Sequence, residues 1–117
     1  MAKYLDILMF AIFDALLILI FVGFSLAPGT ALAQNQELYN GRCAACHGRD
    51  GKGNGPAASA FSPPPSDFTT PGFWRGNDKQ KITDTIKNGH GSMPALSDLS
   101  SSQIKAIIDY MEQAFKP

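Results

Sequence analysis

The stretch Cys43-Ala44-Ala45-Cys46-His47 decides how this chain is read, because it holds both cysteines of a sequence of 117 residues. On a helical turn, two thiols with this spacing can add to the two vinyl groups along one edge of a porphyrin. His47 follows the second cysteine directly, so it is delivered beneath the iron as a ligand. The five residues match the attachment motif of c-type haem and predict one haem bound covalently through Cys43 and Cys46.

Three other readings of the two cysteines explain less. A zinc site needs four ligands and normally a second pair such as another Cys-x-x-Cys, which the sequence lacks. A thioredoxin-like redox pair is expected within a β-α-β pattern, which is also missing. A disulfide between Cys43 and Cys46 would close a small loop, stabilise little and leave His47 without a role. The motif therefore favours haem c.

A haem that only transfers electrons needs a second axial ligand opposite His47. Apart from Met1 and Met9 in its apolar N-terminal segment, the chain has two methionines, Met93 and Met111. Met93 stands in the irregular stretch 91–95, where a loop can direct its sulfur at the iron, whereas Met111 lies on the apolar stripe of a helix and is read as a core residue. His90 is the rival, since it would give a site with two histidines. We predict Met93 as the ligand.

The N-terminal part of the chain differs in composition from the rest. Residues 7–27 are almost entirely apolar, with Asp14 as their single charge, and are long enough for a membrane-spanning helix. The uncharged core of this segment, followed by small residues that end at Ala33, also matches a signal peptide cleaved at that point. We therefore predict a signal peptide or an uncleaved N-terminal membrane anchor over residues 1–33, and a folded domain over residues 34–117.

The folded domain shows the patterns of short helices and long loops. A helix is expected over residues 36–43, followed by a loop rich in glycine and proline over residues 48–71. A second helix is expected over residues 78–88, and Gly89 is placed to end it in a left-handed conformation.

The last helix has the clearest signals. Ser100 is the predicted N-cap, and Gln103 completes a capping box with it. Its apolar stripe consists of Ile104, Ile107, Ile108, Met111 and Phe115. Since so few large side chains make a small core, we expect the faces of the haem to be buried by Phe61, Phe68, Trp74, Ile82, Ile86, Leu96 and Met111.

Residues 34–117 resemble a monohaem class I cytochrome c of the bacterial type. The resemblance rests on the haem motif, on the Met93-Pro94 pair and on aromatic residues at Tyr39 and Tyr110. It implies an all-α fold in which three to four short helices and loops wrap around one haem c. It also implies that Tyr110 of the final helix packs on the first helix.

The resemblance further implies an electron carrier and not an enzyme, because both axial positions are filled and no substrate binds. Such a carrier passes one electron at a time between redox proteins such as a membrane oxidase, reductase or dehydrogenase. The expected location is the periplasm or the outer face of the cytoplasmic membrane, with membrane association through residues 4–27. Two alternatives stay open: a haem-based sensor or enzyme with a labile Met93, and an anchored cytochrome subunit of a membrane redox complex.

Charge argues against a nucleic-acid partner, since ten Lys and Arg residues balance ten Asp and Glu residues and nucleic-acid binders usually carry a basic excess. Two basic groups could steer an acidic redox partner: Arg42, Arg49 and Lys52 beside the haem motif, and Arg75, Lys79, Lys81 and Lys87 further along.

Overall fold

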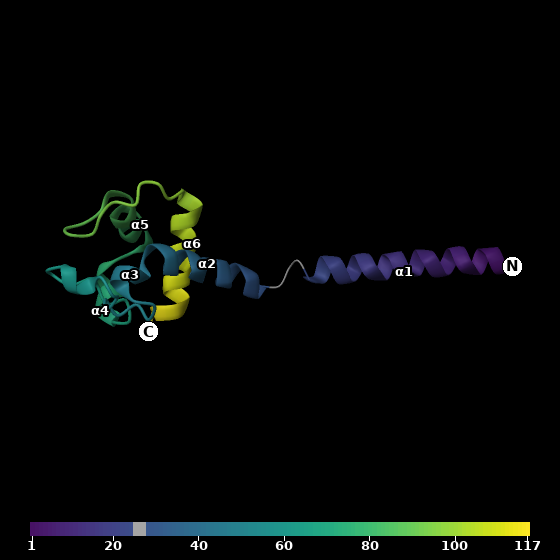
Figure 1. The fold of residues 1–117 in the computed structure, drawn as a ribbon, viewed down its shortest axis with the longest axis horizontal. Coiled ribbons are helices and arrows are strands. Elements are labelled where there is room, and N and C mark those ends of the chain that lie inside the picture. Colours follow the sequence, from purple (N-terminus) through teal and green to yellow (C-terminus); the bar gives the residue numbers. More distant parts are fainter. Residues whose placement is uncertain (25–27) are drawn as a thin grey trace. The chain divides into compact units, whose positions relative to one another are not determined.

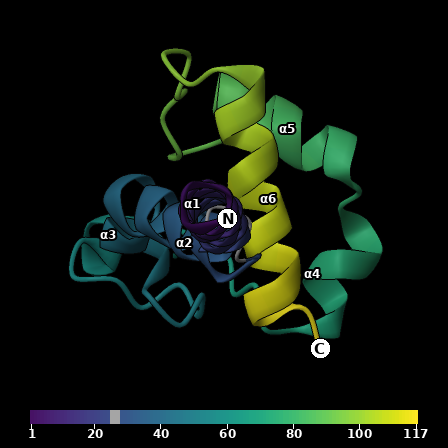
Figure 2. The same ribbon diagram turned by 90° about the vertical axis from the view of Figure 1, so that its right-hand side faces the viewer.

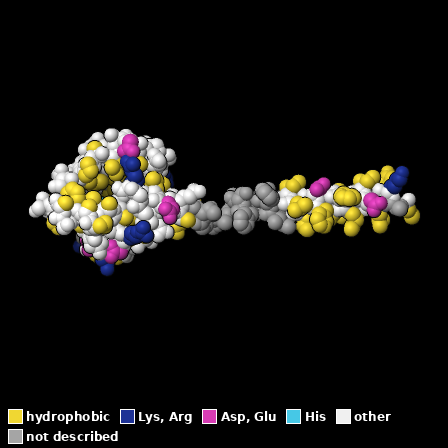
Figure 3. Space-filling model, in the orientation of Figure 1, with side chains coloured by type: hydrophobic (Ala, Val, Ile, Leu, Met, Phe, Trp, Pro, Cys, Tyr) yellow, Lys and Arg dark blue, Asp and Glu magenta, His cyan; other side chains and the backbone are white. Residues whose placement is uncertain are grey.

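The computed structural model describes residues 1–24 and 28–117 and divides the chain into two compact units, Met1–Thr30 and Ala31–Pro117. Helix α1 (Ala2–Phe24) forms most of the first unit (Figure 1), and the large apolar side chains described on it are exposed (Figure 3). Within the described ranges, no helix combines the length and the hydropathy that crossing a lipid bilayer requires. The span predicted over residues 7–27 ends in residues 25–27, which lie outside the described residues.

The second unit is helical, as predicted. Helix α2 (Pro28–Arg42) leads into it, and it contains α3 (Ala44–His47), the short 3-10 helix η1 (Ala58–Ala60), α4 (Pro71–Gly76), α5 (Lys79–Asn88) and α6 (Ser101–Phe115). Helices α5 and α6 pack side by side (Figure 2).

The core of the second unit is built around α6. The five residues of the predicted apolar stripe on this helix are all buried, which confirms the stripe. The ring of Tyr39 on α2 lies 5.2 Å, centroid to centroid, from the ring of Tyr110 and 5.2 Å from that of Phe115. The aromatic contact between the first and last helices of the domain, implied by the resemblance, is therefore present.

The ends of α5 and α6 follow from their sequence. The hydroxyl of Ser100 accepts a hydrogen bond from the N–H of Gln103 at 3.2 Å, and the side-chain oxygen of Gln103 accepts one from the N–H of Ser100 at 2.9 Å. The predicted capping box is thus confirmed.

Asp78 is the N-cap of α5. Gly89 ends α5 with φ +76° and ψ 169°, so its φ is positive as expected, but its ψ is extended rather than left-handed helical.

Three helical segments differ from the sequence prediction, and one of them, η1, lies within the loop expected over residues 48–71. Helix α2 starts before residue 36, at Pro28, and α4 follows directly on the predicted loop at a place where no helix is expected. The side chain of Thr70 caps α4 by accepting a hydrogen bond from the N–H of Phe73, and Pro71 is its first residue. Thr followed by Pro is a helix-start signal, but a helix of only 6 residues is too short to show an apolar stripe.

Candidate functional site

The cysteine and histidine motif forms a single helical turn. Cys43 is the N-cap of α3, and its carbonyl accepts hydrogen bonds from the N–H of Cys46 at 3.2 Å and from the N–H of His47 at 2.9 Å. The N–H of Cys43 in turn donates to the carbonyl of Tyr39 at 2.8 Å. Helix α2 therefore continues into α3 with only Cys43 between them, and the helical placement expected for the motif is present.

The loop after His47 folds back over α3 and provides partners for its carbonyl groups. The N–H of Gly55 donates to the carbonyl of Cys46 at 3.1 Å, and the N–H of Ala57 donates to the carbonyl of Ala45 at 2.9 Å. Gly55 approaches so closely that a Cβ atom there would lie 2.4 Å from the Ala45 oxygen. The last carbonyls of a helix have no partner within it, so these bonds hold a helix of one turn in place.

Tyr39 connects the core to the residue after the motif. Its side chain is buried in the core, and its hydroxyl donates a hydrogen bond to the carbonyl of Gly48 at 2.8 Å. Burial is the largest cause of the raised pKa of Tyr39, which keeps this hydroxyl protonated as a donor. The turn that follows His47 is therefore tied to the aromatic core between α2 and α6.

The imidazole of His47 is held on one edge and one face. Its Nδ1 atom lies 3.2 Å from the carbonyl oxygen of Ser66, and its ring stacks on Phe68 with centroids 4.5 Å apart and an interplanar angle of 20°. A carbonyl only accepts, so Nδ1 carries the proton and the lone pair is on Nε2. Burial lowers the pKa of His47 and the Ser66 contact opposes this shift. A neutral ring with a free Nε2 lone pair is the form that binds a metal.

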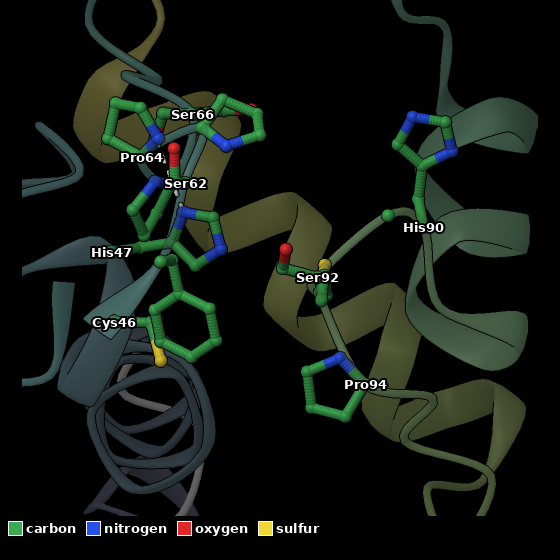
Figure 4. A pocket seen from close by; sticks show the side chains of 13 residues that line it. Cys46, His47, Ser62, Pro64, Ser66, His90, Ser92 and Pro94 are labelled. Carbon is green, nitrogen blue, oxygen red and sulfur yellow. Dashed lines mark hydrogen bonds between the residues drawn. The ribbon is translucent and has the colours of Figure 1, made fainter. Parts of the chain in front are cut away.

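A cavity of about 440 Å³ opens beside His47. Its walls come from three parts of the chain: Cys46 with His47, residues 61–66, and residues 90–94. In Figure 4, the labelled Cys46 and His47 lie on one side, and His90, Ser92 and Pro94 lie on the other. Among the described residues that line the cavity, none is Asp, Glu, Lys or Arg. The volume falls within the range of small-molecule and cofactor sites.

Met93 belongs to a tight turn on the far wall of this cavity. The N–H of His90 donates to the carbonyl of Met93 at 3.1 Å, and the N–H of Met93 donates to the carbonyl of His90 at 2.9 Å. The turn also packs against the end of α5, since a Cβ at Gly89 would lie 2.7 Å from the Met93 carbonyl oxygen. A hydrogen bond of 2.8 Å from the N–H of Leu96 to the carbonyl of Ile86 fixes the residues that follow this turn. Met93 is half-buried in this setting.

The structure brings together three of the four predicted site residues, Cys46, His47 and Met93, as well as the rival ligand His90. Cys43 does not line the cavity; its half-buried side chain packs against the core, and burial raises the pKa of its thiol to about 12. Both cysteines are free thiols.

Met111 is buried in the core at 3% exposure, as predicted for a core residue.

These side chains fit a haem c. One α-helical turn carries both thiols and a neutral imidazole, and a thioether lies across the same uncharged cavity. Imidazole and thioether are the axial ligand pair of cytochromes c. Cys43 and Cys46 would hold the porphyrin edge, while His47 and Met93 would bind the iron.

The apolar residues expected to cover the haem are distributed differently. Of the seven, Phe61 lines the cavity. The others are buried in the core or pack against it, because α5, α6 and the segment around Phe68 form a side-chain core of their own. Six of the seven do not line this cavity, and the expectation that they bury the haem stays a prediction: Phe68, Trp74, Ile82, Ile86, Leu96 and Met111.

Several of the basic residues that could steer a redox partner form contacts with other residues of the domain. Arg42 donates to both carboxylate oxygens of Asp98 at 2.6 Å. Lys79 pairs with Glu112 at 2.7 Å, and the ammonium of Lys81 donates to the carbonyl of Gly76. Arg42, Lys79 and Lys81 therefore connect segments of the domain through these contacts.

Sequence reasoning missed the two groups that hold the His47 ring. The Ser66 contact is made by a backbone carbonyl, so no side-chain signal could reveal it. The sequence predicts that Phe68 contacts the haem, but it gives no sign that the Phe68 ring stacks on His47.

Comparison with known proteins identifies the family of the chain. The family described as cytochrome c oxidase, cbb3-type, subunit III matches residues 30–111. The cbb3-type cytochrome c oxidase subunit FixP of Azorhizobium caulinodans is 40% identical over 90 residues, which is 73% of this chain and 28% of the relative. Subunit CcoP of Azospirillum brasilense is 34% identical over 83 residues, which is 69% of this chain and 28% of the relative. The chain thus spans less than a third of these relatives.

Two further matches are to small cytochromes. Chloroplastic cytochrome c6 of Chlamydomonas reinhardtii is 30% identical over 95 residues, which is 80% of this chain and 62% of the relative. Among solved structures, the c-type cytochrome KustC0563 superposes with a TM-score of 0.59 at 21% identity, over 71% of this chain and 98% of that one. At this identity, the structural match shows a shared fold.

Proposed function

The chain belongs to the family of cytochrome c oxidase, cbb3-type, subunit III, and from this premise we propose that it binds one haem c through Cys43 and Cys46 and carries one electron at a time between redox partners. The family and the structural match confirm the resemblance to a class I cytochrome c and imply haem c as the cofactor. The single haem, its two attachment points and the absence of enzymatic activity are parts of the proposal.

One observation carries the proposal: the His47 imidazole and the Met93 turn face the same cavity from opposite walls, beside Cys46 (Figure 4). When bound, the haem supplies an iron that alternates between the ferrous and ferric states by one electron. His47 and Met93 would be its two ligands, and both are neutral. With both of these ligands supplied by the protein, the iron would have no free position for a substrate, and for this reason we propose a carrier and not an enzyme.

The surroundings keep the ligands in position. The Ser66 carbonyl holds the proton of His47 on Nδ1, so the Nε2 lone pair would be free to bind the iron. The hydrogen bonds from Gly55 and Ala57 fix the helical turn that carries the motif. The uncharged lining means that the described side chains around the cavity bring no charge of their own to either oxidation state.

Met93 is favoured over His90 as the second ligand by burial. Met93 is half-buried and packs against the core, whereas His90 is exposed at the base of the same turn. A thioether is a weak ligand, so it needs a fixed turn to stay on the iron. The paired backbone bonds between His90 and Met93 provide one.

The proposed partner is a membrane oxidase, because two relatives carry the name of a cbb3-type cytochrome c oxidase subunit. Each match covers only 28% of the relative, so this partner is inferred from the relatives' names. The corresponding location is the periplasm or the outer face of the cytoplasmic membrane, with residues 1–33 as a signal peptide or an anchor. The exposed apolar side chains of α1 support association of residues 4–27 with an apolar surface. If the segment is retained, the chain is an anchored cytochrome subunit.

The intact mass of the exported protein tests attachment and processing together. We expect the mass of the chain plus one haem, and the same spectrum reports whether residues 1–33 remain. Wild-type protein should keep its haem during acid-acetone extraction, while a variant with Cys43→Ser and Cys46→Ser should lose it. Ser92→Ala, which changes a cavity residue without removing a thiol, is the matched control and should keep the haem. Haem released from the wild type would overturn the covalent attachment.

A further inference from the structure

The ring of Phe68 covers one face of the His47 imidazole. The two rings are nearly parallel, at 20°, with centroids 4.5 Å apart. Phe68 is 6% exposed, although it lies in a segment without helix or strand. Ser66, whose carbonyl contacts the Nδ1 atom of His47, is in the same segment. One short piece of chain therefore restrains both an edge and a face of the predicted iron ligand.

Phe68 is itself held from several directions. Its N–H donates to the carbonyl of Gly51 at 2.7 Å, and its carbonyl accepts a hydrogen bond from the indole N–H of Trp74 at 2.7 Å. Its ring also packs against Phe73, with centroids 4.8 Å apart. Because both backbone groups and the ring have partners, the ring presents a fixed surface to His47.

We propose that Phe68 is a positioning residue that sets the rotation of the His47 imidazole plane about the axis of its Nε2 lone pair. The inference rests on the proposed function, in which that lone pair binds the haem iron. A hydrogen bond of 3.2 Å to Ser66 tolerates a range of angles. A tightly packed ring on one face does not, because rotation would drive the edge of the imidazole into the Phe68 ring.

The orientation of this plane has a spectroscopic consequence. The plane of an axial imidazole sets how unpaired spin is distributed over a ferric haem, and the proton shifts of the haem methyl groups report that distribution. Groups that contact a metal ligand without touching the metal act on it through orientation of this kind. The role assigned to Phe68 is therefore visible in a measurement that a purely structural residue would not change.

The test is proton NMR of the ferric, haem-loaded full chain. Phe68→Leu removes the flat surface and should change the pattern of the four haem methyl shifts. Tyr110→Leu is the matched control, since Tyr110 lies in the aromatic core with Tyr39 and Phe115 but is not in the His47 stack. It should lower stability and leave the pattern as in the wild type. Phe68→Tyr keeps the ring and should also keep the pattern.

If Phe68→Leu does not yield haem-loaded protein, Phe68→Met fills the space with a flexible chain, offers no ring face and should change the pattern. An unchanged pattern in Phe68→Leu or Phe68→Met would overturn the inference, as would an equal change in Tyr110→Leu. These results differ from a failure of the proposed function, in which the wild type itself would carry no covalent haem.

Discussion

Gly55 is the residue at which the loop comes closest to the turn that carries the motif. A Cβ there would lie 2.4 Å from the carbonyl oxygen of Ala45 and 2.5 Å from that of Ala44. These contacts are with backbone atoms, which cannot move aside as the end of a flexible side chain can. We expect Gly55→Ala to destabilise the haem-loaded protein by about 1–3 kcal/mol, as overpacking does in other proteins, measured by thermal unfolding followed by circular dichroism.

Gly72 provides the matched control. It lies in α4, and a Cβ there would meet nothing within 4 Å. Gly72→Ala should leave stability unchanged or raise it by up to about 1 kcal/mol, because alanine restricts the unfolded chain. Equal unfolding temperatures for Gly55→Ala and the wild type would show that the close approach of the loop is not needed.

The sequence could identify those residues of the site that act through their side chains. Cys43, Cys46, His47 and Met93 came from the spacing of a motif and the chemistry of haem ligands, and their roles remain predictions. Ser66 acts through a backbone carbonyl, and its distance from His47 depends on the path of an irregular loop. No pattern of residue types encodes that path, so this contact could only be found in the structure.

At the scale of helices, Lys79 links the start of α5 to α6. Its ammonium lies 2.7 Å from a carboxylate oxygen of Glu112 and 3.4 Å from one of Asp109. The hydrogen bond from Lys79 is the main cause of the lowered pKa of Glu112. For Asp109, the main cause of its lowered pKa is the hydrogen bond from Lys105, and Lys79 adds to it. Both carboxyl groups therefore favour the charged form in the folded protein.

This linkage predicts how stability depends on pH. A carboxyl group with a lowered folded pKa contributes stability above its unfolded value of about 4, and this contribution is lost as pH falls through the folded value. The unfolding temperature should therefore drop between neutral pH and about pH 3. The drop should be smaller in the variant with Asp109→Asn and Glu112→Gln, measured by circular dichroism at both pH values. An equal drop in wild type and variant would mean that the α5 and α6 ion pairs do not contribute.

Helix ends set by local side chains were predictable, whereas short helices were not. The Ser100 and Gln103 capping box involves residues three positions apart, so the sequence shows it directly. Helix α4 has 6 residues and no buried side chain, so it leaves almost no periodic signal. Its only mark is Thr70 followed by Pro71, which is easily read as part of a proline-rich loop.

At the scale of the molecule, the proposed haem site is the cavity of the second unit. Its walls are residues 46–47, 61–66 and 90–94, which meet only when the whole domain has folded. The all-α fold and the apolar stripe of α6 could be predicted because helical periodicity and capping are local. The shape of the cavity could not, because it depends on contacts between segments that are far apart in the sequence.

The central claim is that His47 and Met93 together hold a haem iron, and carbon monoxide binding tests it most directly. In the wild type, the ferrous protein should bind carbon monoxide slowly or not at all, since Met93 would occupy the sixth position. Met93→Ala should open the iron to carbon monoxide, and His90→Ala, from the same turn, should leave binding as in the wild type. Rapid binding by the wild type, or an open site in His90→Ala but not in Met93→Ala, would contradict this account.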